Sequence, residues 1–366
     1  MPTFPEGYDP NYFPGDSRTF AGAVAAAASA AASAQPSSAT LNGPHSPQEA
    51  PGTSAAAEPS ATALEALLPT FDFDTATDAE VDAIEQAVFK DVRREAAELS
   101  GSYLTSSLVR RCVLQPKTLS DALAVILSGK VHEVLPGALE YTAGGGSRAE
   151  TATAEEAMRD TMARRFREPA LRRAVVSDLI KVLVVDPAAD GLLQPLLFFK
   201  GFHALATYRV ANSLWRDGTP ASKGAALLLQ SRAAELFSVD IHPGATIGNG
   251  VMLDHATGIV VGSTATIGSD VYMLHGVTLG ATGRPVAPGA TRHPTVGSRC
   301  ILGASATILG DIAIGDECTV GAAAIVTKPV PDGSTVVGVN NIVSKVKDVP
   351  PEKRATVDEY DWYYNL

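Results

Sequence analysis

The sequence predicts an α+β protein in two parts, an all-α domain followed by a parallel β-helix. The first observation is the spacing of apolar residues, which recur every three or four positions up to residue 238. From residue 239 to residue 340 the spacing changes to six positions. We therefore expect a helical domain at 65–238 and a β-helix domain at 239–340. A C-terminal tail is expected at 341–366.

Residues 1–64 are rich in alanine, serine, proline and glycine. Such a composition cannot bury enough apolar area to offset chain entropy, and we expect this segment to be disordered. An organelle-targeting peptide would be rich in arginine and poor in acidic residues. In residues 1–64, Arg18 is the only lysine or arginine, whereas five residues are acidic. We expect a cytoplasmic protein, with a plastid or a mitochondrion as the alternative.

The helical domain begins with the segment "AEVDAIEQAVFKDVRREAAELS", whose apolar residues lie on one face of a helix. Asp78 is the expected N-cap of this helix. A second helix, "TLSDALAVILSGK", is expected to end at Gly129, because glycine commonly closes helices.

In the β-helix domain, fourteen apolar residues follow a six-residue period, with a two-residue shift after Ile259 and a longer break after Leu279. They are Ile241, Ile247, Leu253, Ile259, Val261, Ile267, Met273, Leu279, Val296, Leu302, Ile308, Ile314, Val320 and Val326. Each hexapeptide supplies one short strand and one turn, and three of them make a triangular coil.

The longer break, "GATGRPVAPGATRHPT" at 280–295, exceeds a hexapeptide turn. A loop that leaves a regular solenoid is usually functional. This loop carries Arg284, Arg292 and His293.

Composition excludes several classes of protein. A net charge of −11 argues against nucleic acid as the partner, although a small anionic ligand fits wherever a few cations converge. Three cysteines without CxxC spacing predict neither a disulfide framework nor a zinc knuckle and favour a reducing compartment. The chain has no run of consecutive apolar residues long enough to cross a bilayer, so no membrane span is predicted.

Several segments resemble serine O-acetyltransferase, the hexapeptide-repeat family that begins cysteine synthesis. They are "DPAAD", "PLLFFKGFHALATYR", "VDIHPGATIGNGVMLDHATGIVVG", "VTLGATG", "RHP" and "ILGASATILG", within about residues 75–340. The resemblance implies a left-handed β-helix, a homotrimer or hexamer, and acetyl transfer from acetyl-CoA to L-serine without a metal. It also implies feedback inhibition by cysteine.

A serine hydroxyl is a poor nucleophile at neutral pH and needs a base within hydrogen-bond reach. His255 fits this role, because an imidazole can hold the proton in passing. By resemblance Asp240 orients that imidazole, as a carboxylate does in a hydrolase triad. The motif "IHPGA" recurs in hexapeptide acyltransferases with different substrates, so His242 is interpreted as scaffold.

The resemblance assigns four residues to L-serine. Asp186 and Asp254 would face its amino and hydroxyl groups, whereas Arg292 and His293 would bind its carboxylate, which suits an arginine fork. If Asp186 takes part, the helical domain completes the pocket. The alternatives are that Asp186 caps a helix and that Arg292 is a solvated loop charge.

Acetyl-CoA is expected in a groove between neighbouring β-helices. Small residues would admit its pantetheine arm, and cations would meet its phosphates. The candidates are Gly280, Gly283, Arg284, Ala304, Ala322 and Lys328. The chain departs from the family at Ser263, where a glutamate is usual, and in a longer 284–292 span.

The tail ends "VDEYDWYYNL". In this family the C-terminus docks into O-acetylserine sulfhydrylase, usually through a terminal isoleucine. Leu366 departs from that pattern, but an acidic, aromatic tail at 357–366 with a free carboxylate suits the same docking.

Three alternatives remain open. One is a hexapeptide acetyltransferase with another hydroxyl acceptor, and another is a weakly active scaffold that regulates the sulfhydrylase. The third is a zinc enzyme that uses His255, His275 and His293, because these histidines are separated by nearly whole coils.

Overall fold

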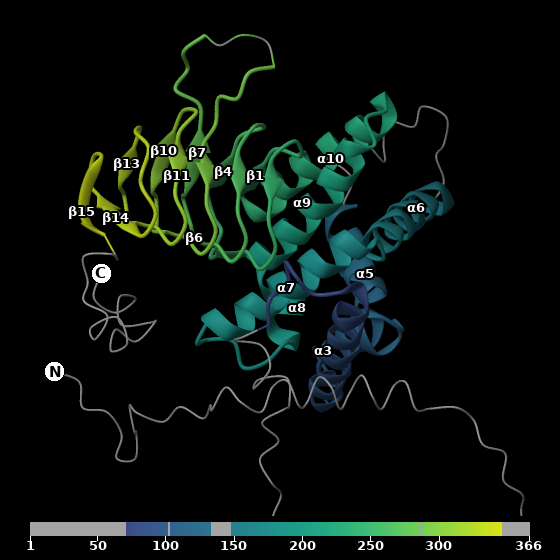
Figure 1. Cartoon of the computed structure of the whole chain (residues 1–366). Coiled ribbons are helices and arrows are strands. Elements are labelled where there is room, and N and C mark those ends of the chain that lie inside the picture. The colour runs from purple at the N-terminus through teal and green to yellow at the C-terminus, as the bar shows by residue number, and fades with distance from the viewer. Residues whose placement is uncertain (1–70, 102, 133–147, 286, 288, 346–366) are drawn as a thin grey trace, which may run out of the picture. The chain divides into compact units, whose positions relative to one another are not determined.

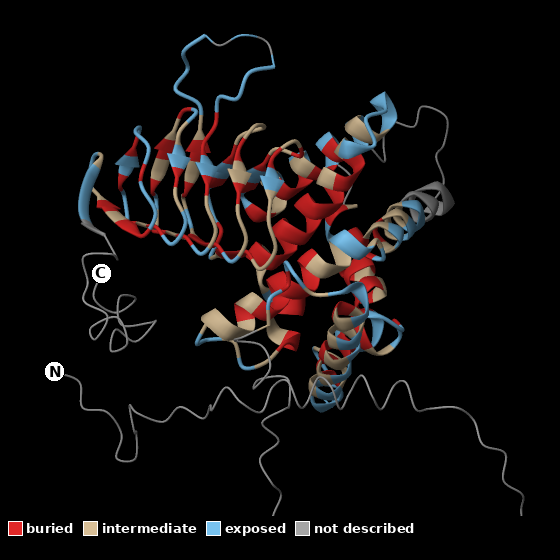
Figure 2. Ribbon diagram, in the orientation of Figure 1, coloured by how far each residue is buried: buried red, intermediate tan, exposed pale blue. Residues whose placement is uncertain are grey.

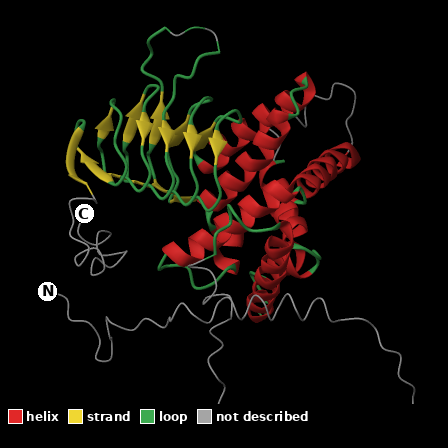
Figure 3. Ribbon diagram, viewed as in Figure 1, coloured by secondary structure: helices red, strands yellow, loops and turns green. Residues whose placement is uncertain are grey.

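The computed structural model describes residues 71–101, 103–132, 148–285, 287 and 289–345 (Figure 1). The predictions for residues 1–64 and for the tail at 357–366 lie outside this part of the chain. Figure 3 shows helices followed by a stack of short strands. The predicted fold class, a helical part followed by a left-handed parallel β-helix, is confirmed.

The helical part contains α-helices and one π-helix between residues 78 and 237. They are α3 (Asp78–Leu99), α4 (Ser106–Val109), the π-helix η2 (Arg110–Leu114), α5 (Leu119–Val131), α6 (Arg148–Phe166), α7 (Pro169–Val185), α8 (Leu193–Phe198), α9 (Lys200–Arg216) and α10 (Pro220–Phe237). Within the described residues, no helix is long and apolar enough to cross a membrane.

Two predicted helix ends are wrong. The N-cap of α3 is Thr77, whose side chain accepts from Glu80 N while the Glu80 carboxylate accepts from Thr77 N at 2.7 Å. This capping box leaves Asp78 as the first helical residue. Helix α5 continues past Gly129 to Val131, whose side chain is 2% exposed. Burial of Val131 outweighs the tendency of glycine to end a helix.

The β-helix has three faces. Its strands are β1 (Val239–Ile241), β2 (Thr246–Ile247), β3 (Met252–Asp254), β4 (Ile259–Val261), β5 (Thr266–Ile267), β6 (Tyr272–Leu274), β7 (Thr278–Gly280), β8 (Thr295–Val296), β9 (Ile301–Leu302), β10 (Thr307–Leu309), β11 (Ala313–Ile314), β12 (Thr319–Val320), β13 (Ile325–Val326), β14 (Ser334–Val337) and β15 (Asn341–Lys345). The first sheet is β1-β4-β7-β10-β13, the second β2-β5-β8-β11, and the third β3-β6-β9-β12-β14-β15. Pairing is parallel except between β14 and β15.

The hexapeptide residues fill the interior of this prism. Thirteen of the fourteen predicted positions are buried, with at most 5% of their surface exposed, and Ile247 is half-buried against the same core. Figure 2 shows buried residues along the strands of the prism and an exposed loop that projects beside β7. The six-residue period therefore identified the core correctly.

Strand register shows which coils are regular. Leu302 pairs with Val320, which is the register expected for a coil of three hexapeptides. Met273 pairs with Leu302, so the coil between them is much longer, and the excess is the loop between β7 and β8. Leu253 pairs with Met273, a coil that exceeds three hexapeptides by two positions. The two extra residues of that coil form part of the site described below.

A buried ion pair joins the helical part to the β-helix. Arg209 of α9 donates to both carboxylate oxygens of Asp178 of α7, at 2.5 and 2.7 Å, and to the carbonyl of Gly248 at 2.7 Å. Asp178 also accepts from Val251 N at 2.9 Å. The pair fixes α7 and α9 against the turn that precedes β3.

Candidate functional site

His255 lies on a two-residue insertion in the first coil. Asp254 pairs with Leu274, and Val260 pairs with Thr278. Between these two pairs the chain advances six positions on the first coil, from 254 to 260, but only four on the second, from 274 to 278. His255 and Ala256 are the extra residues, with φ of 53° and 56°. Ordinary corners on the same edge also place non-glycine residues at such φ, with Ser305 at 59° and Ala323 at 55°, so the insertion and not the backbone angle distinguishes this turn.

The insertion makes a sharp turn. Ala256 N donates to Asp254 O at 2.5 Å, and Thr257 N donates to His255 O at 2.6 Å, so two tight three-residue turns follow each other. Ala256 is fully buried below them. The His255 side chain is consequently pushed outward and is 77% exposed. The two-residue shift after Ile259 in the hexapeptide pattern was the sequence signal for this turn.

Asp254 is the carboxylate beside His255. Its Oδ1 lies 3.8 Å from His255 Nε2, and its Oδ2 accepts a hydrogen bond of 2.6 Å from the Tyr272 hydroxyl. The His275 ring lies across from His255, with 6.1 Å between ring centroids. Sequence reasoning did not identify Tyr272, which lies one coil further along and holds Asp254 in place.

The start of α9 supports the insertion. Lys200 Nζ donates to Thr257 Oγ1. Gly201 packs so closely that a Cβ there would lie 1.9 Å from Leu253 O. The segment "FFKGFHALATYR" contributed to the family resemblance, but the sequence analysis assigned no role to Lys200 or Gly201. A glycine inside a helical pattern was the available signal of a close backbone approach.

His255 begins one edge of the prism, the His255 edge, where the third sheet turns into the first. Its segments are 255–258, 275–277, 303–306 and 321–324. Backbone hydrogen bonds of 2.8 Å link each coil to the next, from Ser305 N to His275 O and from Ala323 N to Ala304 O. The candidates Ala304 and Ala322 therefore lie on the same edge as His255. Their small side chains leave this edge open.

Arg292 and His293 lie on a different edge, the Arg292 edge, where the first sheet turns into the second. Its segments are 242–245, 262–265, 281–294, 310–312 and 327–329. Gly280 ends β7 at the start of the loop, and Gly283 has φ of +75°. Arg284 and Lys328 are exposed, and neither forms an ion pair within the described residues. The two edges border the first sheet on opposite sides.

Thr264 fixes the base of the loop. Its backbone N–H and its hydroxyl lie 3.2 and 2.7 Å from His293 Nδ1, and its hydroxyl oxygen accepts from Arg292 N at 3.0 Å. Because a backbone N–H donates to Nδ1, that nitrogen acts as an acceptor. His293 is therefore neutral, with its proton on Nε2. A Cβ on Gly262 would lie 2.0 Å from the ring, so this glycine makes room for His293.

Burial lowers the pKa of His293, and the charges of Arg292 and His242 lower it further. Burial also lowers the pKa of His242, where Asp240 opposes the shift and Arg292 adds to it. His242 Nδ1 accepts from Gly244 N at 2.9 Å, and its ring packs edge-on against Trp215 with centroids 5.1 Å apart. Both contacts of the His242 side chain are therefore with residues that have no proposed role in the reaction, Gly244 and Trp215.

The other candidate carboxylates are more distant. Asp240 lies in β1 with an exposed side chain, and its Oδ1 accepts from Gln230 Nε2 at 2.7 Å. Asp186 is the C-cap of α7 and accepts from Ala188 N at 2.9 Å. Within the described residues, neither carboxylate contacts His255. The structure thus brings Asp254 and His255 together but leaves Asp240 and Asp186 apart from them.

The three histidines considered as zinc ligands do not converge in one chain. His255 and His275 face each other, whereas the Nδ1 of His293 is engaged by Thr264 on the Arg292 edge. The described part of the chain contains no group of three or more histidine, cysteine or acidic side chains that could together hold a metal ion.

Comparisons with known proteins identify the family of this chain. Residues 88–207 match the family described as "Serine acetyltransferase, N-terminal", and residues 295–328 match "Hexapeptide repeat of succinyl-transferase". The serine acetyltransferase of Escherichia coli K12 is 34% identical over 282 residues, which cover 76% of this chain and 93% of that protein.

Solved structures are similar over most of the chain. Soybean serine acetyltransferase complexed with serine is 37% identical with a TM-score of 0.62, and the match covers 71% of this chain and 99% of that one. A serine acetyltransferase in complex with cysteine is 35% identical with a TM-score of 0.62, over 71% of this chain and 100% of that one. This chain belongs to the serine acetyltransferase family of transferases.

Proposed function

We propose that this protein transfers the acetyl group of acetyl-CoA to the hydroxyl of L-serine, producing O-acetyl-L-serine and CoA as the first step of cysteine synthesis. The observation that carries the proposal is His255, which the inserted turn holds exposed beside Asp254. The soybean relative complexed with serine supports the choice of acceptor.

His255 acts as the general base. Its Nε2 lies on the side of Asp254, so the serine hydroxyl gives its proton to Nε2 while its oxygen attacks the thioester carbonyl. The carbon–sulfur bond then breaks, and the sulfur of CoA leaves with the proton from Nε2. A positioned base of this kind accelerates a reaction by about 10²–10⁴-fold.

Asp240 would orient the base through the other ring nitrogen, Nδ1, although within the described residues its carboxylate accepts from Gln230 and does not contact His255. Supporting this role, β1 pairs directly with β4, the strand that leaves the inserted turn, and places Asp240 beside Val260. A carboxylate on Nδ1 fixes the tautomer and stabilises the imidazolium formed during transfer.

L-Serine carries both signs of charge, and its pocket must match both. Asp254 has only 13% of its side chain exposed and offers a carboxylate to the ammonium and hydroxyl side, with Asp186 as a second carboxylate. Arg292 offers its guanidinium, and His293 its Nε2–H, to the substrate carboxylate.

The site is formed between two subunits of a trimer, which pairs into a hexamer. Within one chain the three-residue strands of the first sheet separate the two edges by roughly 10 Å. A single serine does not span that distance, so the His255 edge of one subunit must face the Arg292 edge of the next. Cyclic symmetry completes every site in this way. The exposed apolar residues Val260 and Ile325 on the first sheet suit such an interface.

Acetyl-CoA lies along the same junction, without a metal. Ala304 and Ala322, stacked in successive coils, leave room for the pantetheine arm. Gly280 at the end of β7 and Gly283 in the loop would allow a close backbone approach, and Arg284 and Lys328, which form no ion pair within the described residues, would meet the phosphates.

Cysteine is the expected feedback inhibitor, because it has the ammonium and carboxylate of serine with a thiol in place of the hydroxyl. The relative solved in complex with cysteine supports this proposal. The C-terminal segment 357–366, outside the described residues, is proposed to dock into O-acetylserine sulfhydrylase through its terminal carboxylate.

The test is release of the CoA thiol from acetyl-CoA by the purified protein, with and without L-serine, compared with His255→Ala and with His275→Ala as the neighbouring control. We expect serine-dependent release that His255→Ala abolishes and His275→Ala retains. Release only with another hydroxyl compound would establish a different acceptor. No release with any acceptor, together with binding of the sulfhydrylase, would establish a regulatory scaffold.

A further inference from the structure

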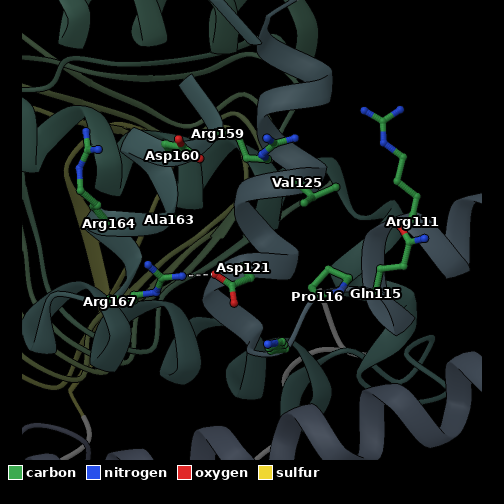
Figure 4. A pocket seen from close by; sticks show the side chains of 11 residues that line it. Arg111, Gln115, Pro116, Asp121, Val125, Arg159, Asp160, Ala163, Arg164 and Arg167 are labelled. Carbon is green, nitrogen blue, oxygen red and sulfur yellow. Dashed lines mark hydrogen bonds and ion pairs between the residues drawn. The ribbon is translucent and has the colours of Figure 1, made fainter. Parts of the chain in front are cut away.

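A cationic cleft lies in the helical part, away from both edges of the β-helix. Its volume is about 700 Å³, and its walls come from η2, α5, α6 and the segment that joins η2 to α5 (Figure 4). Small-molecule sites commonly have volumes of about 300–1,000 Å³. The lining cations are Arg111, Lys117, Arg159, Arg164 and Arg167.

The cleft is positive although the protein is acidic. Five cations line it against two carboxylates, those of Asp121 and Asp160, so the lining has a net charge of 5 − 2 = +3. The whole chain has a net charge of −11. Clustered like charges destabilise a folded protein unless counter-charges neutralise them, so the cleft favours an anionic ligand.

Ion pairs account for only part of this charge. Figure 4 shows Arg167 turned to Asp121, with which it pairs. Arg111 pairs with Glu155 at 3.0 Å. Within the described residues, Lys117 and Arg159 form neither an ion pair nor a side-chain hydrogen bond. These two side chains are therefore available to a ligand.

A third available cation is Arg164. It donates only to the hydroxyl of Thr161, at 3.1 Å, and has no carboxylate partner within the described residues. Its guanidinium can bind two phosphate oxygens at once, as can that of Arg159. Three available cations suit an anion with several adjacent negative charges.

One wall of the cleft is held in an unusual conformation. Residues 110–114 form a π-helix, a rare element that is frequent at functional sites. The next residues, Gln115 and Pro116, line the cleft. Arg93 Nη1 donates to the carbonyls of Val113, Leu114 and Pro116 at 3.1, 2.9 and 2.9 Å. This wall is therefore fixed before any ligand binds.

We propose that this cleft binds a nucleoside di- or triphosphate. Its phosphates would bind the available cations Lys117, Arg159 and Arg164. Its nucleoside would lie against the apolar lining of Pro116, Val125 and Ala163. This site is separate from the proposed acetyl-transfer site and does not depend on it.

Isothermal titration calorimetry of the full-length protein with ATP in magnesium-free buffer tests the proposal. A parallel titration of Lys328→Ala, which lacks a cation of the proposed CoA site, distinguishes ATP bound at that site from ATP bound in the cleft, and its Kd for ATP should be unchanged. We expect saturable binding, with a Kd raised about tenfold or more by Arg159→Ala and by Lys117→Ala, because each removes a charge-assisted hydrogen bond. Arg159→Lys should lose less than Arg159→Ala.

The matched control is Arg110→Ala, because Arg110 is exposed on the same π-helix but does not line the cleft. Its Kd for ATP should equal that of the unmodified protein. Equal losses in Arg110→Ala and Arg159→Ala, or no saturable binding, would overturn the proposal. Inorganic tripolyphosphate should bind more weakly than ATP, and equal affinity would refute the nucleoside contact. Unchanged melting temperatures would verify that the variants fold.

Discussion

His255 is exposed because of its backbone conformation. Its φ of 53° and that of Ala256, 56°, turn the chain outward, while the buried Ala256 side chain anchors the turn. A histidine at an ordinary hexapeptide corner, such as His275, lacks this insertion. The inserted pair therefore distinguishes the proposed base from its neighbour on the same edge.

The two carboxylates proposed around His255 have different roles and should give different kinetics. Asp240→Asn should lower kcat by roughly 10²–10⁴-fold with little change in the KM for serine, because the base loses its fixed tautomer and the stabilisation of its imidazolium. Asp254→Asn should mainly raise the KM for serine, because Asp254 would bind the substrate ammonium. Steady-state kinetics at saturating acetyl-CoA measures both. The reverse pattern would exchange the two assignments.

A buried histidine links stability to pH. His203 is 1% exposed, and its Nε2 bonds to Leu196 O at 2.8 Å. Burial lowers the pKa of His203 from 6.5 to about 4. The unfolded chain therefore takes up a proton first as pH falls below about 6.5, and the folded chain follows only near pH 4.

The resulting loss of stability is negligible well above pH 6.5, grows as pH falls through 6.5, and reaches about 3 kcal/mol at pH 4. His203→Gln keeps a donor for Leu196 O but cannot titrate. Urea unfolding at pH 7, 5.5 and 4 should show a smaller acid-induced loss of unfolding free energy in His203→Gln, while the exposed control His275→Gln behaves like the unmodified protein. Parallel pH curves for all three proteins would contradict this explanation.

At the scale of elements, α9 supports the proposed catalytic turn. Gly201→Ala would place a Cβ 1.9 Å from Leu253 O, which is backbone and cannot move aside alone. We expect α9 to shift with its Lys200 contact to Thr257, and kcat to fall by about 10²-fold, because small misplacements of a reacting group are costly.

Gly224→Ala in α10 is the matched control, because nothing lies within 4 Å of a Cβ at that helical glycine. It should leave kcat unchanged and raise the unfolding free energy by up to about 1 kcal/mol through helix propensity. Thiol-release kinetics and thermal unfolding of both variants provide the comparison. If kcat is unchanged in Gly201→Ala, α9 does not support the proposed catalytic turn.

The periodicity of apolar residues predicted the elements well wherever regularly spaced apolar side chains pack into a single core. The β-helix interior was found because each coil repeats the same inward position, as at Leu302 and Val320. Helix ends were less predictable, because they depend on tertiary contacts such as the burial of Val131 or on the choice between neighbouring caps, as at Thr77 and Asp78.

The candidate site was only partly predictable, because part of it also depends on tertiary contacts. His255 and Asp254 are neighbours in the sequence, and the phase shift located their turn. Tyr272 and Gly201 act across coils or across domains. Contacts across coils depend on which residues of neighbouring coils lie side by side. The six-residue period of the sequence gives this register only approximately where residues are inserted.

For the whole molecule, we propose that the edges of two neighbouring subunits form each acetyl-transfer site. His255 and Arg292 lie on edges separated by the first sheet, and the described residues include no contact between them. Such an arrangement would allow serine, a small zwitterion, to bind although a single chain separates the proposed base from the proposed carboxylate-binding residues.

Subunit mixing tests this arrangement of the two edges. His255→Ala and Arg292→Ala chains, each inactive alone at low serine, would be co-expressed with different affinity tags and purified through both. Each mixed trimer then contains one intact pair of edges, whereas an unmixed trimer within a doubly tagged hexamer contains none, so CoA thiol release should return to at most about a third of the unmodified rate. If the mixed trimers are no more active than the two single variants, His255 and Arg292 do not meet across a subunit boundary, and the proposed site is wrong.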